Sequence, residues 1–152
     1  VWQCHPRSRG TVRLASSDPT AAPLIEPRYF SDPYDRKVIV EGVKILREIA
    51  SQPAFRELWD CEMEPGDDVS SDAALWDAVR HKGGTVFHCV GTCRMGSDEH
   101  SVVDPQLRVR GVQGLRVVDA SVMPTVTSAN TNSPSLMIGE KGAALILEGD
   151  PA

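Results

Sequence analysis

Residues 85–96 read TVFHCVGTCRMG, and this stretch predicts a strand followed by a turn. Its first three residues are β-branched or aromatic and predict a strand, and Gly91 then predicts a turn. His88 therefore stands at the end of the predicted strand, just before the turn. A strand end beside a turn is a common position for catalytic side chains, because the scaffold is rigid while the ring stays accessible.

His88 is a candidate general base, since histidine is the side chain whose charge changes near neutral pH. Asn130 and Asn132 flank Thr131 in a polar loop further along the chain. A carboxamide both donates and accepts hydrogen bonds, so one of them beside a histidine can orient an alcohol or stabilise an alkoxide. The alternative is a packed histidine bonded to backbone and two asparagines that satisfy the loop. Residue type alone leaves both interpretations open.

The remainder of this half of the chain predicts two strands and a helix. Leu107–Val109 and Leu115–Val118 have strand composition, and the segment from Gly111 to Gly114 predicts a hairpin turn between them. A final helix is expected from Ser133 to about Leu147. Its first turn carries no acidic side chain, so its free amides can receive an anionic cofactor atom, or water and Ser133 can cap them.

Residues before this half predict a strand and helices. Alternating residues favour a strand at Thr11–Leu14, and an apolar stripe predicts a helix over Tyr34–Ile49, capped by Ser31 or Asp32. A shorter helical run is expected through Phe55, Leu58 and Trp59. Another helix should start at Ser71–Asp72 and end at residues 81–84, where cations and glycines are typical of a helix terminus. The expected class is therefore α+β.

Composition excludes several classes of protein. The chain has 152 residues, 41% of them hydrophobic, which suits one soluble domain. Its 16 Lys and Arg against 21 Asp and Glu give a net charge of −5, so we expect no nucleic-acid partner. The longest apolar run, Ala143–Leu147, is far short of the roughly 20 residues of a transmembrane helix. Four sparse cysteines favour neither a disulfide scaffold nor a metal site.

Several separate stretches together resemble the C-terminal region of the glucose-methanol-choline (GMC) oxidoreductase family, flavoenzymes that oxidise alcohols with FAD. In the second half they are residues 85–96, Val103–Pro105, Leu107–Val109, Gly114–Pro124, Asn130–Asn132 and Met137–Lys141. In the first half they are Ser8–Gly10, Leu14, Ser17–Pro19, Pro27, Tyr29 and Asp32–Ile49. The resemblance is closest to choline-oxidising members and covers nearly the whole chain.

The resemblance implies a role for each candidate residue. His88 is similar to the family's histidine that takes the substrate hydroxyl proton while hydride passes to the flavin, and Asn130 falls at the second active-site position. The implied FAD contacts are Asp119, Ala120, Thr131 and Asn132. The expected reaction is oxidation of a primary alcohol, choline-like or other, to an aldehyde. Which alcohol, and which electron acceptor, the sequence leaves open.

The resemblance also implies an incomplete enzyme. The family's G-x-G-x-x-G dinucleotide fingerprint is missing from this sequence, and the chain starts at Val1 rather than Met, so we expect a fragment. Residues 1–84 should form mainly the antiparallel substrate-side sheet with its helices. Residues 85–152 should supply the catalytic histidine and the last strand and helix of a two-lobe flavoenzyme's FAD-binding lobe.

Two kinds of partner follow from this prediction: a small-molecule alcohol and the N-terminal remainder of the flavoenzyme. We expect the fragment alone to be inactive, and the complete enzyme to be cytoplasmic. A different class of function also fits, namely a non-catalytic binding or subunit-pairing module derived from this fold, with or without a Cys/His metal site.

Overall fold

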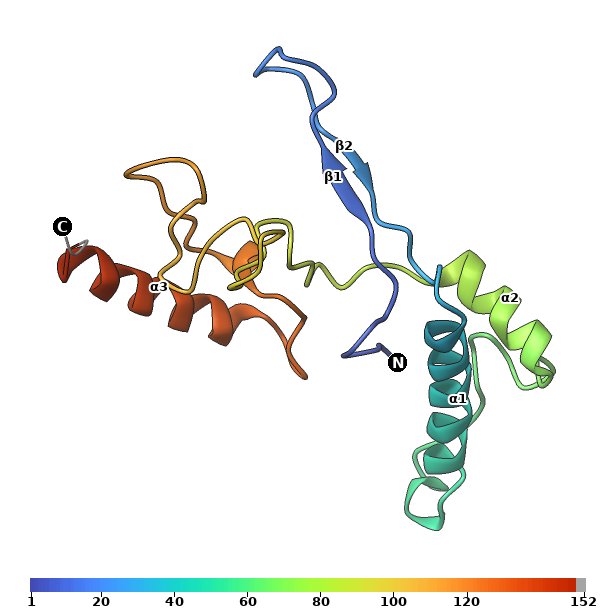
Figure 1. The fold of residues 1–152 in the computed structure, drawn as a ribbon. Helices are drawn as coiled ribbons and strands as arrows, with labels where there is room; N and C mark the ends of the chain where they lie inside the picture. The colour runs from blue at the N-terminus through green and yellow to red at the C-terminus, as the bar shows by residue number, and fades with distance from the viewer. Residues whose placement is uncertain (150–152) are drawn as a thin grey trace. The chain divides into compact units, whose positions relative to one another are not determined.

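The computed structural model describes residues 1–149, so residues 150–152 of the second predicted lobe lie outside the described residues. The structure is a mixture of helices and one small sheet (Figure 1), which confirms the expected α+β class. The elements in chain order are β1 (Thr11–Arg13), β2 (Leu24–Glu26), α1 (Pro33–Ala50), η1 (Pro53–Phe55), α2 (Asp72–Lys82), η2 (Ala120–Val122) and α3 (Asn132–Leu147).

The chain forms two compact units. Unit 1 consists of Val1–Gly10 and Glu26–Thr85, and unit 2 consists of Thr11–Ile25 and the chain from Val86 onward. The predicted division after residue 84 lies one residue from the division after Thr85. The hairpin segment Thr11–Ile25 groups with unit 2 and not with the rest of the first half. Assignment of the units to substrate-side and FAD-binding lobes stays a prediction.

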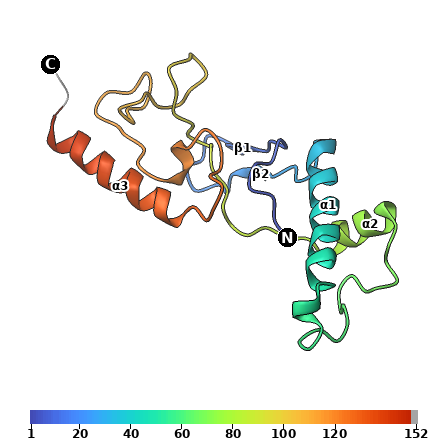
Figure 2. The ribbon, with the colours of Figure 1, turned by 90° about the horizontal axis from the view of Figure 1, so that it is seen from below.

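Unit 1 is organised by α1 and α2, which contact each other and lie at an angle to one another (Figures 1 and 2). Ile39 and Val40 of α1 and Leu75 of α2 are buried at their contact. The predicted caps are confirmed, because Asp32 Oδ1 accepts from the Tyr34 amide at 2.8 Å and Ser71 caps α2. By contrast, the helical run expected through Phe55, Leu58 and Trp59 is a single 3₁₀ turn, η1, which ends before Leu58.

Asp35, in the first turn of α1, is the anchor of the N-terminal segment. Its carboxylate is 1% exposed and accepts from the amides of Arg7 and Ser8 at 2.8 and 2.7 Å, from the Ser8 hydroxyl, and from Gln3 Nε2 at 2.8 Å. Burial by itself raises the pKa of Asp35, but these hydrogen bonds outweigh it and hold the pKa below its usual value. The segment before β1 is thus fixed to α1 by one buried charge.

Arg47 fixes the connector between η1 and α2. Its guanidinium donates to both carboxylate oxygens of Glu62, at 2.7 and 2.9 Å, and to the carbonyl oxygens of Val69 and Gly66 at 2.8 and 3.1 Å. A planar guanidinium suits this paired geometry, which explains why a cation lies off the apolar stripe of α1 but is still half-buried.

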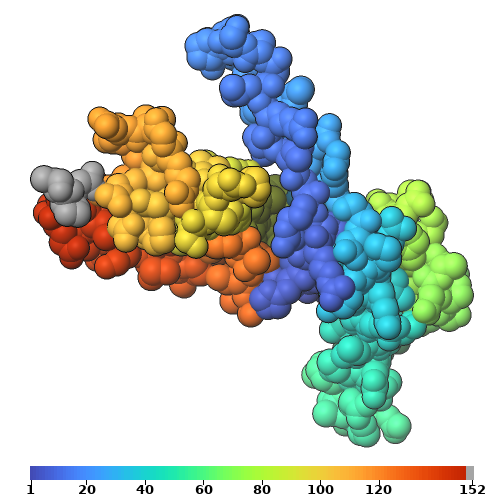
Figure 3. Space-filling model, viewed as in Figure 1, coloured from blue at the N-terminus to red at the C-terminus, as the bar shows by residue number. Residues whose placement is uncertain are grey.

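The strands β1 and β2 form a two-stranded antiparallel sheet, which confirms the strand expected from residue 11. Residues 12–29 are exposed, and the loop between the strands is the blue segment at the top of Figure 3. Gly10 begins the hairpin at a close approach, where a Cβ atom would lie 2.6 Å from the Pro27 carbonyl oxygen and closer to that of Glu26. The site therefore requires glycine.

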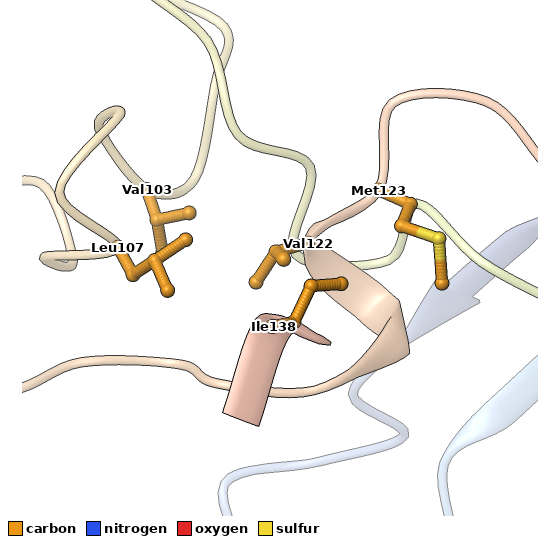
Figure 4. Close-up of a cluster of buried hydrophobic side chains, with 5 residues drawn as sticks. All are labelled: Val103, Leu107, Val122, Met123 and Ile138. Carbon is orange, nitrogen blue, oxygen red and sulfur yellow. The ribbon is translucent and has the colours of Figure 1, made fainter. Parts of the chain in front are cut away.

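Unit 2 builds its core mainly from loops. Its buried side chains form one cluster (Figure 4). They come from loops, from η2 and from α3, and are Val103, Leu107, Val122, Met123 and Ile138. Gly142 of α3 lies against Val118, so close that a Cβ atom would collide with the valine side chain. Helix α3 therefore packs against the loop at Val118 through a residue without a side chain.

The predicted hairpin around residues 107–118 pairs as expected but forms no continuous strands. The Val109 amide donates to Leu115 O at 2.9 Å and the Val117 amide to Leu107 O at 3.1 Å, and only isolated bridges result. Gly111 and Gly114 in the turn have positive φ, at 76° and 70°. The expected last strand, residues 115–118, is therefore only a bridged segment.

Within residues 1–149, no helix has both the length and the apolar composition that crossing a membrane requires.

Candidate active site

His88 lies in an extended loop, not at the end of a strand. The structure assigns no strand to residues 85–87, so that prediction is wrong, and Phe87 has a φ of 61°. A left-handed backbone at an aromatic residue is a strained conformation that breaks strand geometry. The turn at Gly91 is confirmed by its φ of 90°. His88 itself is half-buried between these two left-handed positions.

The imidazole of His88 is held through one nitrogen. Thr131 Oγ1 lies 2.9 Å from Nδ1, and the Thr131 amide nitrogen lies 3.5 Å from the same atom. Thr131 is 8% exposed, although it belongs to a loop. The contact joins two segments 43 residues apart and makes Nε2 the ring nitrogen that is available to a substrate.

The two asparagines stand on either side of this contact. Asn130 precedes Thr131 and Asn132 is the first residue of α3, and both are exposed. Within residues 1–149, neither carboxamide makes a hydrogen bond. Sequence neighbours have Cα atoms about 3.8 Å apart. Asn130 and Asn132 therefore both lie next to Thr131, the residue that contacts His88. The structure brings the expected segments together through the His88–Thr131 contact.

The amino end of α3 suits an electron-rich group. No side chain caps its first amides and no acidic residue stands in its first turn. Pro134 has no amide hydrogen, and the Ser135 amide donates to the Thr131 carbonyl oxygen at 3.0 Å. The unpaired amides and the helix dipole favour negative charge at this end, which fits the reduced ring of a flavin.

Asp119 and Ala120, the other expected FAD contacts, lie at η2. Asp119 Oδ1 accepts from the Ser121 amide at 2.7 Å and so begins the 3₁₀ turn. The backbone after His88 pairs with this turn, since the Cys93 amide donates to Ser121 O at 3.0 Å and the Met95 amide to Val122 O at 2.8 Å. Helix α3 also contacts η2. All six expected site residues therefore belong to unit 2.

Two ion pairs near the site were not anticipated from the sequence. Arg94 donates to both carboxylate oxygens of Asp98, at 2.9 and 2.8 Å, and these bonds hold the pKa of Asp98 well below its usual range. Burial opposes a lower pKa at Asp104, but hydrogen bonds from the Arg108 amide and guanidinium lower it. Neither pair lies in a helix, so the i, i+4 rule for helix surfaces does not predict them.

Arg110 closes the same loop from the other side. Its guanidinium donates to Ser101 Oγ and to Gly96 O, both at 2.8 Å. Ser101 in turn donates to backbone carbonyl oxygens of Gly96 and Asp98. These contacts hold the loop that follows His88, and those of Arg110 join residues 9 and 14 positions apart, which no local pattern predicts.

The metal-binding alternative lacks a set of ligands in the described part of the chain. No group of three or more His, Cys, Asp or Glu side chains among residues 1–149 is arranged to hold a metal ion. Among residues 1–149, none of the four cysteines forms a disulfide bond.

Comparison with known proteins supports the same identification. A family model described as GMC oxidoreductase matches residues 6–139. Choline oxidase from Arthrobacter globiformis is 51% identical over 93% of this chain and 27% of its own length. An alcohol dehydrogenase (acceptor) from Pseudomonas putida is 46% identical over 93% of this chain and 26% of its own length. This chain thus spans about a quarter of the length of these curated relatives.

A solved structure gives the same result for the fold. The FAD-dependent oxidoreductase from Chaetomium thermophilum superposes with a TM-score of 0.89 and 32% identity, over 95% of this chain and 25% of that protein.

Proposed function

This chain belongs to the GMC oxidoreductase family, and on that premise we propose that it supplies the proton-accepting side of an FAD-dependent enzyme that oxidises a primary alcohol to an aldehyde. The observation that carries the proposal is the His88–Thr131 contact, which fixes an imidazole by Nδ1 and leaves Nε2 to receive a proton. Relatives with names that specify choline or alcohol oxidation support a CH–OH donor.

In this proposal the chain's own residues prepare the alcohol. Nε2 of His88 accepts the hydroxyl proton, which raises the electron density on the carbinol carbon and makes its hydride easier to transfer. A positioned base of this kind contributes about 10²- to 10⁴-fold in rate. Asn130 holds the same substrate oxygen by a hydrogen bond, which orients the alcohol and stabilises the developing alkoxide.

The cofactor contacts are assigned to the same unit. Asp119, Ala120, Thr131 and Asn132 would border FAD, and the unpaired amides of α3 would favour its ring when it gains negative charge. Bound FAD supplies the hydride acceptor. Since this chain spans about a quarter of its relatives' length, the remainder of a flavoenzyme chain is the expected partner that completes the FAD site.

The test is the rate at which an alcohol reduces the flavin of the full-length enzyme, followed by stopped-flow absorbance with choline and a panel of other primary alcohols. His88→Ala should lower the limiting rate by about 10²- to 10⁴-fold with FAD still bound. The matched control is His81→Ala, since His81 is an exposed residue of α2 and should leave the rate unchanged. Unchanged reduction in His88→Ala would remove this histidine from the mechanism.

A second pair of variants separates the two asparagines. Asn130→Ala should slow flavin reduction while FAD content stays normal, whereas Asn132→Ala should mainly weaken FAD retention. If Asn132→Ala slows reduction and Asn130→Ala does not, the substrate contact belongs to the first residue of α3 and the assignment is reversed.

The non-catalytic module remains the alternative, and the same experiment decides it. A full-length protein that holds FAD but is reduced by no alcohol would favour a binding or subunit-pairing role. The cytoplasmic location expected from the sequence stays a prediction, which fractionation of cells expressing the full-length protein would test.

A further inference from the structure

Thr131 occupies the N-cap position of α3 but does not cap the helix. A threonine at this position normally accepts, through its hydroxyl, from an amide two or three residues later. Here the residue has φ −83° and ψ 0°, and its side chain makes no cap hydrogen bond. Its hydroxyl lies instead 2.9 Å from His88 Nδ1. Because the side chain is buried, this is a built contact and not a chance one at the surface.

The backbone of Thr131 is fixed by the helix that it precedes. Its carbonyl oxygen accepts from the Ser135 amide at 3.0 Å and from the Ser135 hydroxyl at 2.6 Å. The position of the Thr131 hydroxyl is therefore set by the first turn of α3. Through this hydroxyl, the orientation of the His88 ring is tied to the helix whose amino end is assigned to the cofactor.

The protonation state of the two ring nitrogens determines the role of the hydroxyl. A neutral imidazole carries one N–H, so Nε2 can accept a proton only while Nδ1 carries the hydrogen. That hydrogen needs an acceptor, and Thr131 Oγ1 lies at hydrogen-bond distance. The Thr131 amide is also a donor and would compete, but at 3.5 Å it lies beyond the usual 2.7–3.2 Å range.

We propose that Thr131 is a positioning residue, whose hydroxyl oxygen accepts from Nδ1–H of His88 and so keeps Nε2 unprotonated and facing the alcohol. This inference rests on the proposed function of His88 as the base. It adds to the implied FAD contact at Thr131 a separate role toward the histidine.

The test compares variants that differ only in the hydroxyl. Thr131→Val replaces it with a methyl group of similar size, and Thr131→Ser keeps it. If valine disturbs folding, Thr131→Ala against Thr131→Ser provides a second pair in which both lack the methyl group. Thr127→Val is the matched control, because within residues 1–149 the Thr127 hydroxyl bonds the Ala129 carbonyl oxygen of its own loop and not the histidine. Measurements use the full-length FAD-bound enzyme.

Loss of the hydroxyl should lower the limiting rate of flavin reduction by about 10- to 100-fold, the range found when the hydrogen-bond partner of a metal-bound histidine is removed. KM should change little, and serine should restore most of the rate. The acidic limb of the pH–rate profile should move to lower pH in Thr131→Val, because an acceptor that stabilises the charged ring has been removed. The melting temperature should match that of Thr127→Val, and rates are compared per bound FAD, since Thr131 is also assigned as an FAD contact.

Three results would overturn the inference. They are a Thr131→Val rate within about twofold of wild type, a serine variant as slow as the variant without a hydroxyl, and a limb that moves to higher pH, which would mean that the hydroxyl donates to Nδ1. Failure of the proposed function is distinguished by His88→Ala. If that variant is slow while Thr131→Val is normal, only the inference on Thr131 is wrong.

Discussion

The two units of this chain are stabilised in different ways. Unit 1 packs two capped helices and relies on half-buried or buried charges, Asp35 and Arg47, to fix the irregular segments to them. Unit 2 has one long helix, and its core is enclosed by loop backbone that bonds to itself around Val103 and Val122. The candidate site is in the second unit, where the chain is least regular.

This difference has a functional reason. Helix caps and apolar stripes stabilise a regular scaffold. The imidazole, the side-chain amides and the amino end of α3 meet in irregular backbone, where loops can place side chains from distant segments together. Phe87, with its left-handed backbone beside His88, shows this directly. We therefore expect substitutions of buried charges to lower the stability of unit 1, and substitutions that disturb packing to lower the stability of unit 2.

The largest effect is expected from Asp35→Asn. Removal of the buried charge weakens hydrogen bonds from Gln3, Arg7 and Ser8, and should lower the free energy of unfolding by about 3 kcal/mol. Hydrogen exchange should increase in α1 and not in α3. The control is Asp77→Asn, since that carboxylate is exposed on α2. Equal loss of protection in both helices would contradict the comparison.

The same residue predicts a pH dependence. The pKa of Asp35 is lowered in the folded protein, so its stabilising effect is complete above the unfolded value of about 3.9 and is lost as pH falls toward the folded pKa. Unit 1 of the wild type should therefore lose stability below about pH 4. Circular dichroism melts between pH 6 and pH 3 should show a shallower dependence in Asp35→Asn.

The next largest effect is expected in unit 2, from Gly142→Ala. The added methyl group collides with Val118, and such overpacking costs about 1–3 kcal/mol. The control is Gly139→Ala, on the same helix, where a Cβ atom meets nothing within 4 Å among the described residues. That substitution should raise helix stability by up to about 1 kcal/mol. Thermal unfolding of the 152-residue chain distinguishes the two, and equal melting temperatures would refute the close contact.

A smaller effect is expected from Arg47→Lys. Lysine keeps the charge but cannot bond Glu62 at two points while reaching two carbonyl oxygens, so about 1 kcal/mol should be lost. The connector between η1 and α2 should become more sensitive to limited proteolysis. Lys37→Ala, at an exposed position of the same helix, should not have this effect.

The smallest effect is expected from Asp98→Asn. The Arg94–Asp98 pair has good geometry but is open to water, so its loss should change the melting temperature by less than about 2 °C. A larger change would mean that unit 2 also depends on surface charge, and would weaken the distinction between the units.

Much of the scaffold could be predicted because its signals are local. The α1 start at Asp32–Pro33, the α2 start at Ser71 and the glycine turn near residue 111 each depend on the chemistry of a few neighbouring residues. The segments of the site were likewise identifiable, since the resemblance to a family marks His88 and the loop before α3.

Tertiary structure decided what these local signals could not. No pattern predicts that Asp35 is buried, because a carboxylate in a first turn is ordinarily solvated and only distant donors make burial tolerable. The same holds for Thr131, which has the sequence position of a helix cap but bonds a ring 43 residues away. Sequence determined which groups are present and which elements they form, whereas long-range contacts determined the partner of each group, since a hydrogen bond depends on position in space.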